Sequence, residues 1–286
     1  MKNKYFAFLL VFLLCTPLVA QTSDWSGVEK IFGRKGATIG DVFKIAFPRT
    51  DIYMTIHRVH VEPALALTSW IAFKPEGGQA MIMGDLVLLQ GEVPRVMAKL
   101  LESGIEITAL HNHLLDELPH VMYIHYEGHG APEELAQTMK NALSLSATPM
   151  RATKPAKVPA IDWSAVEKSI GRKGTANGSI YQIGIPRADT VTENGMEIPP
   201  SMGVATSINF QKAVKQVAST GDFVLVASEV NPVIKTLTEN GITVTAIHNH
   251  MINESPRLFF VHFWGYGSPE KIGGGLKAAL EKVNVR

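Results

Sequence analysis

The sequence predicts an α+β fold made by tandem duplication of an α/β sandwich unit, with a mainly antiparallel sheet and pseudo-two-fold symmetry. Three observations lead to this prediction. Long segments of the first half of the chain return in the second half, and each copy carries strand-like and helix-like segments in the same order. The composition, with 46% hydrophobic and 19% charged residues over 286 positions, is that of a globular protein.

The two copies align with a single one-residue gap. The segment DWSGVEKIFGRKG, which begins at Asp24, returns as DWSAVEKSIGRKG from Asp162, and GDLVLLQGEV from Gly84 returns as GDFVLVASEV from Gly221. Between the copies lies TPMRATKPAKVPAI, whose three prolines are typical of a linker. We therefore expect four regions: a signal peptide over residues 1–20, a first repeat over 21–147, a linker over 148–161 and a second repeat over 162–286.

The strands of each copy are predicted by runs of apolar, β-branched and aromatic residues. DVFKIAF and LTSWIAF are strand-like by alternation, QAMIMGDLVLL is largely apolar, and IEITALHNH and VMYIHYEG follow later in the chain. In the first copy these five predicted strands cover residues 41–47, 67–73, 79–89, 105–113 and 121–128.

Three helices are predicted in each copy. The first, WSGVEKIFG, is amphipathic and closes at Gly33, a residue type common just after a helix. The second, EVPRVMAKLLESG, has Pro94 in its first turn, and the third, PEELAQTMKNAL, begins with Pro132 and two acidic residues that suit the helix dipole. The later part of each copy therefore runs β-α-β-β-α, an order that favours helices on one face of a mainly antiparallel sheet.

The first twenty residues, MKNKYFAFLLVFLLCTPLVA, are typical of a secretory signal peptide. Their apolar run is too short to span a bilayer comfortably, so we expect an exported protein, periplasmic or secreted, with no stable membrane span after cleavage. The one cysteine, Cys15, lies inside this run, so disulfides and thiolate metal ligands are excluded from the mature chain.

A net charge of +1 offers no basic excess for a nucleic-acid partner.

Histidines are the main chemical signal. The chain has 10 of them, and the segment HNH occurs twice, each time followed four residues later by a glutamate. Residues two apart on a strand share a face, so two imidazoles and one carboxylate in each copy can hold a zinc, iron or manganese ion. The predicted ligands are His111, His113, Glu117, His248, His250 and Glu254.

A third histidine follows in each copy, at His125 and His262. A hairpin symmetric about Asp116 places His125 opposite Ile107, roughly 13 Å from the ion, so these two residues are secondary candidates. Strand histidines are also often half-buried and hydrogen-bonded without any ligand, so structural packing remains the alternative. The hairpin nevertheless keeps its polar residues in register while the stretch from Asp51 to Gln79 differs widely between the copies, which favours a site.

Other polar residues also recur in both copies. Arg49 and Arg187, within the repeated PR-x-D strings, are candidates for binding an anion such as a carboxylate or phosphate, and an arginine–aspartate pair that fixes a turn is the alternative. Asp85 and Asp222 are candidates for further metal ligands or bases. Glu92 falls where a helix begins, and the helix dipole explains it.

Several strings occur in both copies: GRKG, PR-x-D, GD-x-VL and, most specifically, TA-[LI]-HNH-x3-E-x-P…H-x-x-G-x-G. They resemble the LppY/LpqO family, a bacterial family of exported proteins built around a domain of unknown function. The resemblance covers nearly the whole chain after its first twenty residues; it implies export and an uncharacterised role, and it assigns no catalytic residues. The chain departs from it before Cys15, where Phe12, Leu13 and Leu14 stand in place of the small residues that lipid attachment needs.

Two functions fit these observations. The first is an exported protein that binds a divalent metal ion through the repeated HNHxxxE hairpin and acts as a metal-dependent hydrolase on a small-molecule substrate. The alternative is a non-catalytic periplasmic ligand-binding or scaffold protein in which the histidine hairpins are structural.

Overall fold

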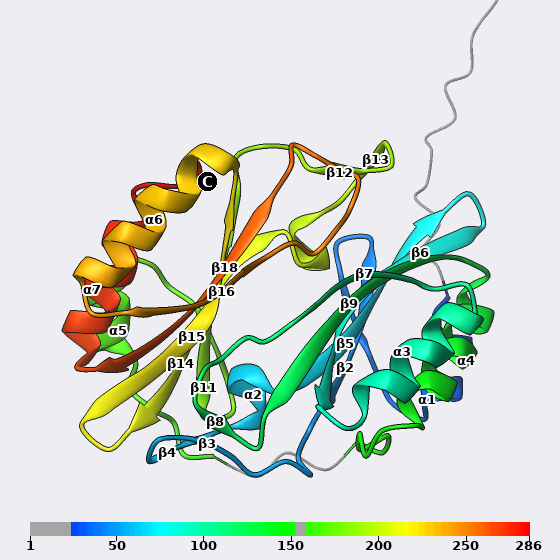
Figure 1. The fold of residues 1–286 in the computed structure, drawn as a ribbon, viewed down its shortest axis with the longest axis horizontal. Helices are drawn as coiled ribbons and strands as arrows, with labels where there is room; N and C mark the ends of the chain where they lie inside the picture. Colours follow the sequence, from blue (N-terminus) through cyan, green and yellow to red (C-terminus); the bar gives the residue numbers. More distant parts are fainter. Residues whose placement is uncertain (1–23, 153–157) are drawn as a thin grey trace, which may run out of the picture.

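The computed structural model describes residues 24–152 and 158–286. The expected signal peptide lies outside the described residues. Two α/β units stand side by side with their sheets toward the middle of the molecule and their helices on the two outer sides (Figure 1). This arrangement confirms the predicted fold class, a duplicated α+β unit with antiparallel sheets.

The first repeat is a six-stranded antiparallel sheet in the order β1-β2-β5-β6-β9-β7. Its strands are β1 (Ala37–Ile39), β2 (Val42–Pro48), β5 (Thr68–Glu76), β6 (Gln79–Leu89), β7 (Glu106–His111) and β9 (Val121–Gly130). Three helices cover the outer face of this sheet: α1 (Ser26–Phe32), α3 (Val93–Glu102) and α4 (Pro132–Leu143). All of these elements except β1 were predicted from the sequence.

The second repeat has the same topology, in the order β10-β11-β14-β15-β18-β16. Its strands are β10 (Thr175–Asn177), β11 (Ile180–Pro186), β14 (Ala205–Ala213), β15 (Gln216–Leu225), β16 (Thr243–His248) and β18 (Phe259–Gly267). Its helices are α5 (Ser164–Ile170), α6 (Ala227–Glu239) and α7 (Pro269–Leu280), which pack against the outer face.

A short arm leaves each repeat, and the sequence did not predict it. In the first repeat the arm holds β3 (Met54–Ile56), β4 (Val59–Val61) and the helix α2 (Pro63–Ala66). In the second repeat it holds β12 (Thr192–Glu193), β13 (Met196–Glu197) and the 3-10 helix η1 (Pro200–Met202). Each arm forms a three-stranded sheet with a strand of its own repeat, β8 (Glu117–Leu118) or β17 (Glu254–Ser255).

The arms join the two repeats. Gln211 on β14 accepts a hydrogen bond from the backbone N–H of Glu62 (2.8 Å) and donates one to the carbonyl of His60 (2.7 Å), so the first arm lies on the second sheet. Two of the four buried apolar clusters contain residues of both repeats; one of them packs Met83 of β6 against Phe260 of β18. The inner faces of the sheets therefore share a core.

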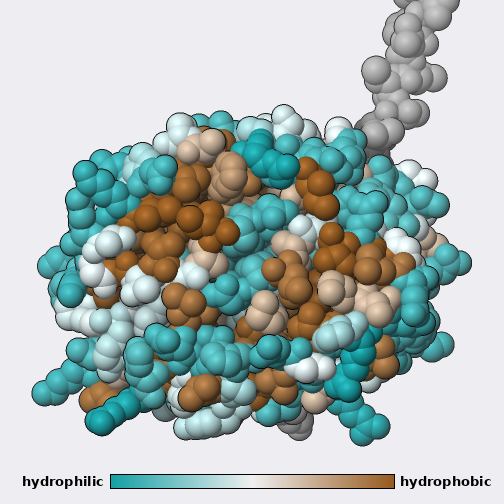
Figure 2. All heavy atoms as spheres, viewed as in Figure 1, coloured by the Kyte–Doolittle hydropathy of each residue, from teal (hydrophilic) through white to brown (hydrophobic). Residues whose placement is uncertain are grey.

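The surface combines polar cover with apolar side chains. Figure 2 shows hydrophobic residues over both repeats on the face in view. Some of the exposed apolar residues are related by the duplication, such as Leu110 and Ile247, or Leu115 and Ile252. Within residues 24–152 and 158–286, no helix is both long and apolar enough to cross a membrane.

Candidate metal centre

Six histidines, three from each repeat, gather between the two sheets. The closest ring pairs all cross from one repeat to the other: the centroids of His111 and His248 are 3.5 Å apart. The centroids of His113 and His262, and those of His125 and His250, are each 3.8 Å apart. The duplication relates the pair His113–His262 to the pair His125–His250, and it relates His111 and His248 to each other. The cluster therefore lies on the pseudo-two-fold axis. The six residues are His111, His113, His125, His248, His250 and His262.

The third histidine of each repeat belongs to this cluster, and its predicted distance of roughly 13 Å is wrong. The pairing of β7 with β9 shifts by one residue between Ile107 and Ala109, so His125 lies opposite Ala109 rather than Ile107. This β-bulge at Thr108 moves His125 to a ring-centroid distance of 5.0 Å from His111. The same bulge in β16 brings His262 to 4.8 Å from His248.

The nitrogen atoms of these rings are close enough to share an ion. Among the residues that the structure describes, four sets of three have ligand atoms that all lie within 4.8 Å of one another, and two of these sets draw on both repeats. The sets are His111–His248–His262, His125–His248–His250, His111–His113–His125 and Asp222–His250–His262. The candidate centre is thus shared between the copies, whereas the sequence predicted one set of ligands within each copy.

Hydrogen bonds orient most of the rings. The Nδ1 atoms of His125 and His262 lie 3.2 and 2.8 Å from the carbonyl oxygens of Gly84 and Gly221, and Nδ1 of His250 lies 3.2 Å from the Gly203 carbonyl. An imidazole that donates through Nδ1 carries its lone pair on Nε2, which is the usual orientation of a metal-binding histidine.

The six Nε2 atoms are buried, and within the part of the chain that the structure describes none has a hydrogen-bond partner. Unpaired polar atoms in a protein interior are rare because each one costs free energy. Burial also lowers the pKa of all six side chains, to about 4 for His111 and about 3 for His262. The imidazoles are therefore neutral at physiological pH, the form that binds metal ions.

Two aspartates complete the cluster. Asp85 on β6 and Asp222 on β15 lie opposite His125 and His262 in their sheets. Their carboxylates come within 3.5 Å of Nε2 of His113 and His250, respectively. Burial raises the pKa of Asp85 well above its ordinary value, and burial raises that of Asp222 to about 7. The structure therefore places both sequence candidates beside the histidines.

The two predicted glutamate ligands lie elsewhere, and this part of the prediction is corrected. Glu117 is on β8 and Glu254 on β17, strands that pair with the arms rather than with the large sheets. The Glu117 carboxylate is 3.6 Å from Nδ1 of His120, and the Glu254 carboxylate accepts hydrogen bonds from Arg257 and from the backbone N–H of Leu258. None of the ligand sets found among the described residues includes either one.

Arg49 and Arg187 are structural residues, so their predicted role in anion binding is corrected too. The buried Arg49 guanidinium donates to Asp51, to Glu92 and to the carbonyl of Val87, which engages all five of its N–H groups. Arg187 repeats this pattern with the corresponding residues of the second copy. Glu92 is therefore explained by its pair with Arg49 and not by the helix dipole alone.

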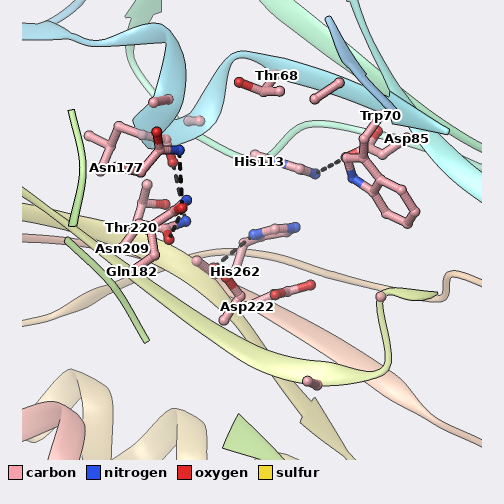
Figure 3. A pocket seen from close by; sticks show the side chains of 18 of the residues that line it. Thr68, Trp70, Asp85, His113, Asn177, Gln182, Asn209, Thr220, Asp222 and His262 are labelled. Atoms are coloured by element: carbon pink, nitrogen blue, oxygen red, sulfur yellow. Dashed lines mark hydrogen bonds and ion pairs between the residues drawn. The ribbon is translucent and has the colours of Figure 1, made fainter. Parts of the chain in front are cut away.

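A cavity of about 390 Å³ opens directly onto the cluster. His113, His125, His250 and His262 line it together with both aspartates and with polar side chains of the second repeat. Figure 3 shows His113, His262, Asp85 and Asp222 on one side, and Gln182 and Asn209 on another. Two further lining residues, Lys44 and Trp70, were missed from the sequence because they are not repeated. Gln182 and Ser207 hold the equivalent sheet positions in the second repeat.

The comparisons with known proteins bear on the family. The model of the family described as "Domain of Unknown Function (DUF1259)" matches residues 26–145 and again 164–282. No curated protein matches the chain. Two solved structures align at low similarity, a trimeric bacterial microcompartment shell protein PduB and EtuB from Clostridium kluyveri.

PduB is 12% identical over 87% of this chain and 89% of its own, with a TM-score of 0.21. EtuB is 8% identical over 86% of this chain and 88% of its own, with a TM-score of 0.20. TM-scores of this size do not establish a common fold. The two family matches together cover most of the sequence, and the chain therefore belongs to the DUF1259 family and carries two copies of its domain of unknown function.

Proposed function

We propose that the six histidines and two aspartates bind divalent metal shared by the two repeats, and that the bound ion activates water for hydrolysis of a small molecule held in the adjoining cavity. The observation that carries this proposal is the set of six buried Nε2 atoms without partners, gathered from both copies.

The cost of burial supports metal binding over mere packing. An unsatisfied polar atom in the interior costs about 1–3 kcal/mol, and the cluster collects six such atoms in one place. A metal ion removes this cost by accepting the lone pairs. Neutral imidazoles suit zinc and iron, and the flanking carboxylates also admit manganese.

The chemistry follows from the position of the cavity. A divalent ion held by these histidines would lower the pKa of a coordinated water toward neutrality and would polarise a substrate oxygen. The water oxygen forms a bond to the electrophilic carbon or phosphorus of the substrate, and the bond to the leaving group breaks. Asp222, whose pKa lies at about 7, would accept the proton of the water and return it to the leaving group, because its carboxylate lines the cavity beside the histidines.

Export is a part of this proposal that rests on the signal-like first twenty residues. N-terminal sequencing of the protein recovered from a cell that expresses the full chain tests it. We expect the mature chain to begin at or near Gln21, and an intact N-terminus in the cytoplasm would contradict export.

The metal content of the purified protein tests the proposed metal binding. The mature protein is purified without a tag, reconstituted with zinc, iron or manganese and dialysed, and its metal is measured by elemental analysis. We expect stoichiometric metal in the wild type. We expect His111→Ala and His248→Ala each to remove more than half of it, because each residue occurs in ligand sets that draw on both repeats.

The control is His129→Ala, since His129 is exposed and pairs with Glu76 at the surface. That variant retains the wild-type metal content. A protein that takes up no metal would refute the proposal. Retention of half of the metal in each variant would point to two independent centres, one for each repeat.

A further inference from the structure

We infer that the cavity beside the metal centre takes a small polyhydroxylated anion, and that the second repeat recognises its hydroxyl groups while Lys44 of the first repeat binds its anionic group. This inference deepens the proposed function and rests on it. It starts from the places where the two copies differ.

The residues next to the histidines are the same in both copies. Asp85 and His125 are cross-strand neighbours on β6 and β9, and Asp222 and His262 are the equivalent neighbours on β15 and β18. The adjacent row on the same face differs. In the first sheet it holds Lys44, Ala72 and Met83, and in the second sheet it holds Gln182, Asn209 and Thr220.

The two rows have different surroundings. Ala72 and Met83 are buried in an apolar cluster together with residues of the second arm, such as Met202. Asn209 and Thr220 line the cavity instead. In the second sheet all three residues of the row, Gln182, Asn209 and Thr220, line the cavity, whereas in the first sheet Lys44 alone of its row does so.

A further difference between the two copies, at Trp70 and Ser207, leaves room for the cavity. Trp70 lies beside Asp85 in the first sheet, and a Cβ added to Gly203 would come within 3.1 Å of its indole ring, so the second arm packs closely there. Ser207 takes the equivalent place beside Asp222 in the second sheet. The small serine leaves room where the first sheet has an indole ring, and Ser207 lines the cavity together with Ala64 and Ala66 of α2.

The polar wall is held in a fixed arrangement. The amide of Gln182 donates to Oδ1 of Asn209 at 3.3 Å, and Asn177 donates to Oε1 of Gln182 at 3.2 Å. Figure 3 shows these side chains together with Thr220 on one side of the cavity, facing the histidine side. Amide groups donate and accept at once, which matches the donor and acceptor character of substrate hydroxyl groups.

The charge of the cavity calls for an anion once metal is bound. Lys44 lines the cavity with its ammonium group 3.6 Å from the centroid of the Trp70 ring, and it donates to the Ser201 carbonyl at 3.4 Å. Burial lowers the pKa of Lys44 to about 8, so most of it remains protonated at neutral pH. Lys44 and one divalent ion together outweigh the two carboxylates, and the net positive charge favours a carboxylate or a phosphate on the substrate.

Size limits the substrate further. A cavity of about 390 Å³ lies near the lower end of ligand sites. It suits a molecule the size of a monosaccharide. A single sugar ring or open polyol chain with one anionic group fulfils the requirements of size, charge and hydrogen bonding.

Four probes of similar size separate these requirements. They are D-glucuronate, glucose 6-phosphate, glucose and cyclohexanecarboxylate, each titrated by calorimetry into the metal-loaded full-length mature protein. We expect measurable binding of glucuronate or glucose 6-phosphate, and the stronger of the two identifies a carboxylate or a phosphate. We expect glucose, which lacks the charge, and cyclohexanecarboxylate, which lacks the hydroxyl groups, to bind at least tenfold more weakly.

Three variants test the assignment of the wall. Ser207→Trp introduces the residue of the first copy and fills the cavity, and Asn209→Ala removes one amide in case the larger change prevents folding. Both should weaken binding of the preferred probe at least tenfold with unchanged metal content. Lys44→Met should weaken binding of the anion and leave the weak binding of glucose unchanged. Asn141→Ala, an exposed position on α4, is the matched control and keeps the wild-type affinity.

The outcomes separate this inference from the function on which it rests. A protein without metal refutes the proposed function, and the inference falls with it. A metal-loaded protein that binds none of the four probes, or binds cyclohexanecarboxylate as well as glucuronate, overturns the inference and leaves the metal centre standing. Wild-type affinity in a folded Asn209→Ala variant overturns the role of the second repeat.

Discussion

The asparagine between the two histidines of each HNH segment links the repeats. Nδ2 of Asn112 donates to the carbonyl of Thr245 at 3.1 Å, and Nδ2 of Asn249 donates to the carbonyl of Thr108 at 2.8 Å. Each amide also donates to a carbonyl two residues ahead, which fixes the local turn. The central residue of the motif therefore holds the two histidine segments in place across the pseudo-two-fold axis.

We expect Asn112→Ala and Asn249→Ala each to lower the free energy of unfolding by about 1–2 kcal/mol, because each leaves a half-buried carbonyl of the other repeat without its donor. Urea unfolding of the metal-free protein measures the change. Asn141→Ala, at the surface, should stay within about 0.5 kcal/mol of the wild type. Losses no larger than this control would show that the bridges do not contribute to stability.

At the level of single residues, the sequence predicted four of the six histidines as primary ligands and ranked the two glutamates above the two aspartates that lie beside the histidines. Glu117 is near His113 along the chain, but its strand pairs with the arm. Asp85 is distant along the chain, and the pairing of β6 with β9 brings it beside the histidines. Spacing along the chain shows which residues share one strand, whereas neighbours across a sheet depend on pairing that a single sequence does not display.

Among the elements, the bulged strands β7 and β16 determine the geometry of the centre. The bulge falls at Thr108 and at the equivalent Thr245, whose hydroxyl groups donate to the carbonyls of His250 and His113 in the other repeat. The extra residue shifts the pairing so that the third histidine reaches the first two. The composition of these segments predicted the strands and could not predict the bulge, because threonine is also common in strands without a bulge.

The close approach of β14 and β15 at Gly221 is a second requirement for the geometry of the centre. A Cβ at Gly221 would meet the backbone carbonyl of Ser207 on the neighbouring strand, and the carbonyl of Gly221 is the partner of His262. We expect Gly221→Ala to lower the free energy of unfolding by about 3 kcal/mol and to reduce the metal content, because β14 must move away from β15.

Gly184→Ala is the control for that change, since a Cβ at Gly184 on β11 meets no atom within 4 Å. Urea unfolding and elemental analysis compare the two variants. Equal stability and equal metal content in both would contradict the importance of this close approach.

For the whole molecule, the duplication and the order of the main elements could be predicted, and the relation between the copies could not. The repeated strings revealed two units with antiparallel sheets. The arms that contact the opposite repeat lie in the stretch from residue 51 to 79 and its equivalent, where the copies differ most. Because divergent segments show no repeat, the sequence predicted two separate sites where the structure has one shared cluster.

Two buried glutamates, one from each repeat, lie near each other where the repeats meet. Glu127 on β9 and Glu193 on β12 are both buried, and each has one carboxylate oxygen without a partner among the described residues. Burial, followed by the nearby Glu193 carboxylate, raises the pKa of Glu127 to about 7. In the unfolded chain this pKa returns to about 4.5, so the protonated folded form contributes stability at low pH that is lost as the pH rises through 7.

We therefore expect the wild type to lose about 1 kcal/mol more stability than Glu127→Gln between pH 6 and pH 8.5, since glutamine cannot ionise. Urea unfolding at the two pH values measures this difference, and the comparison with the variant cancels the titration of other groups. A parallel pH dependence of wild type and Glu127→Gln would contradict the proton held by this pair.

A crystal structure of the reconstituted protein, with anomalous data collected at the metal edge, would show whether both repeats hold one metal centre. We expect an anomalous peak about 2.0–2.1 Å from the Nε2 atoms of histidines of both copies, with His111 or His248 among them. A peak held by His113 and Glu117 of one copy alone, or the absence of any peak after reconstitution, would contradict it.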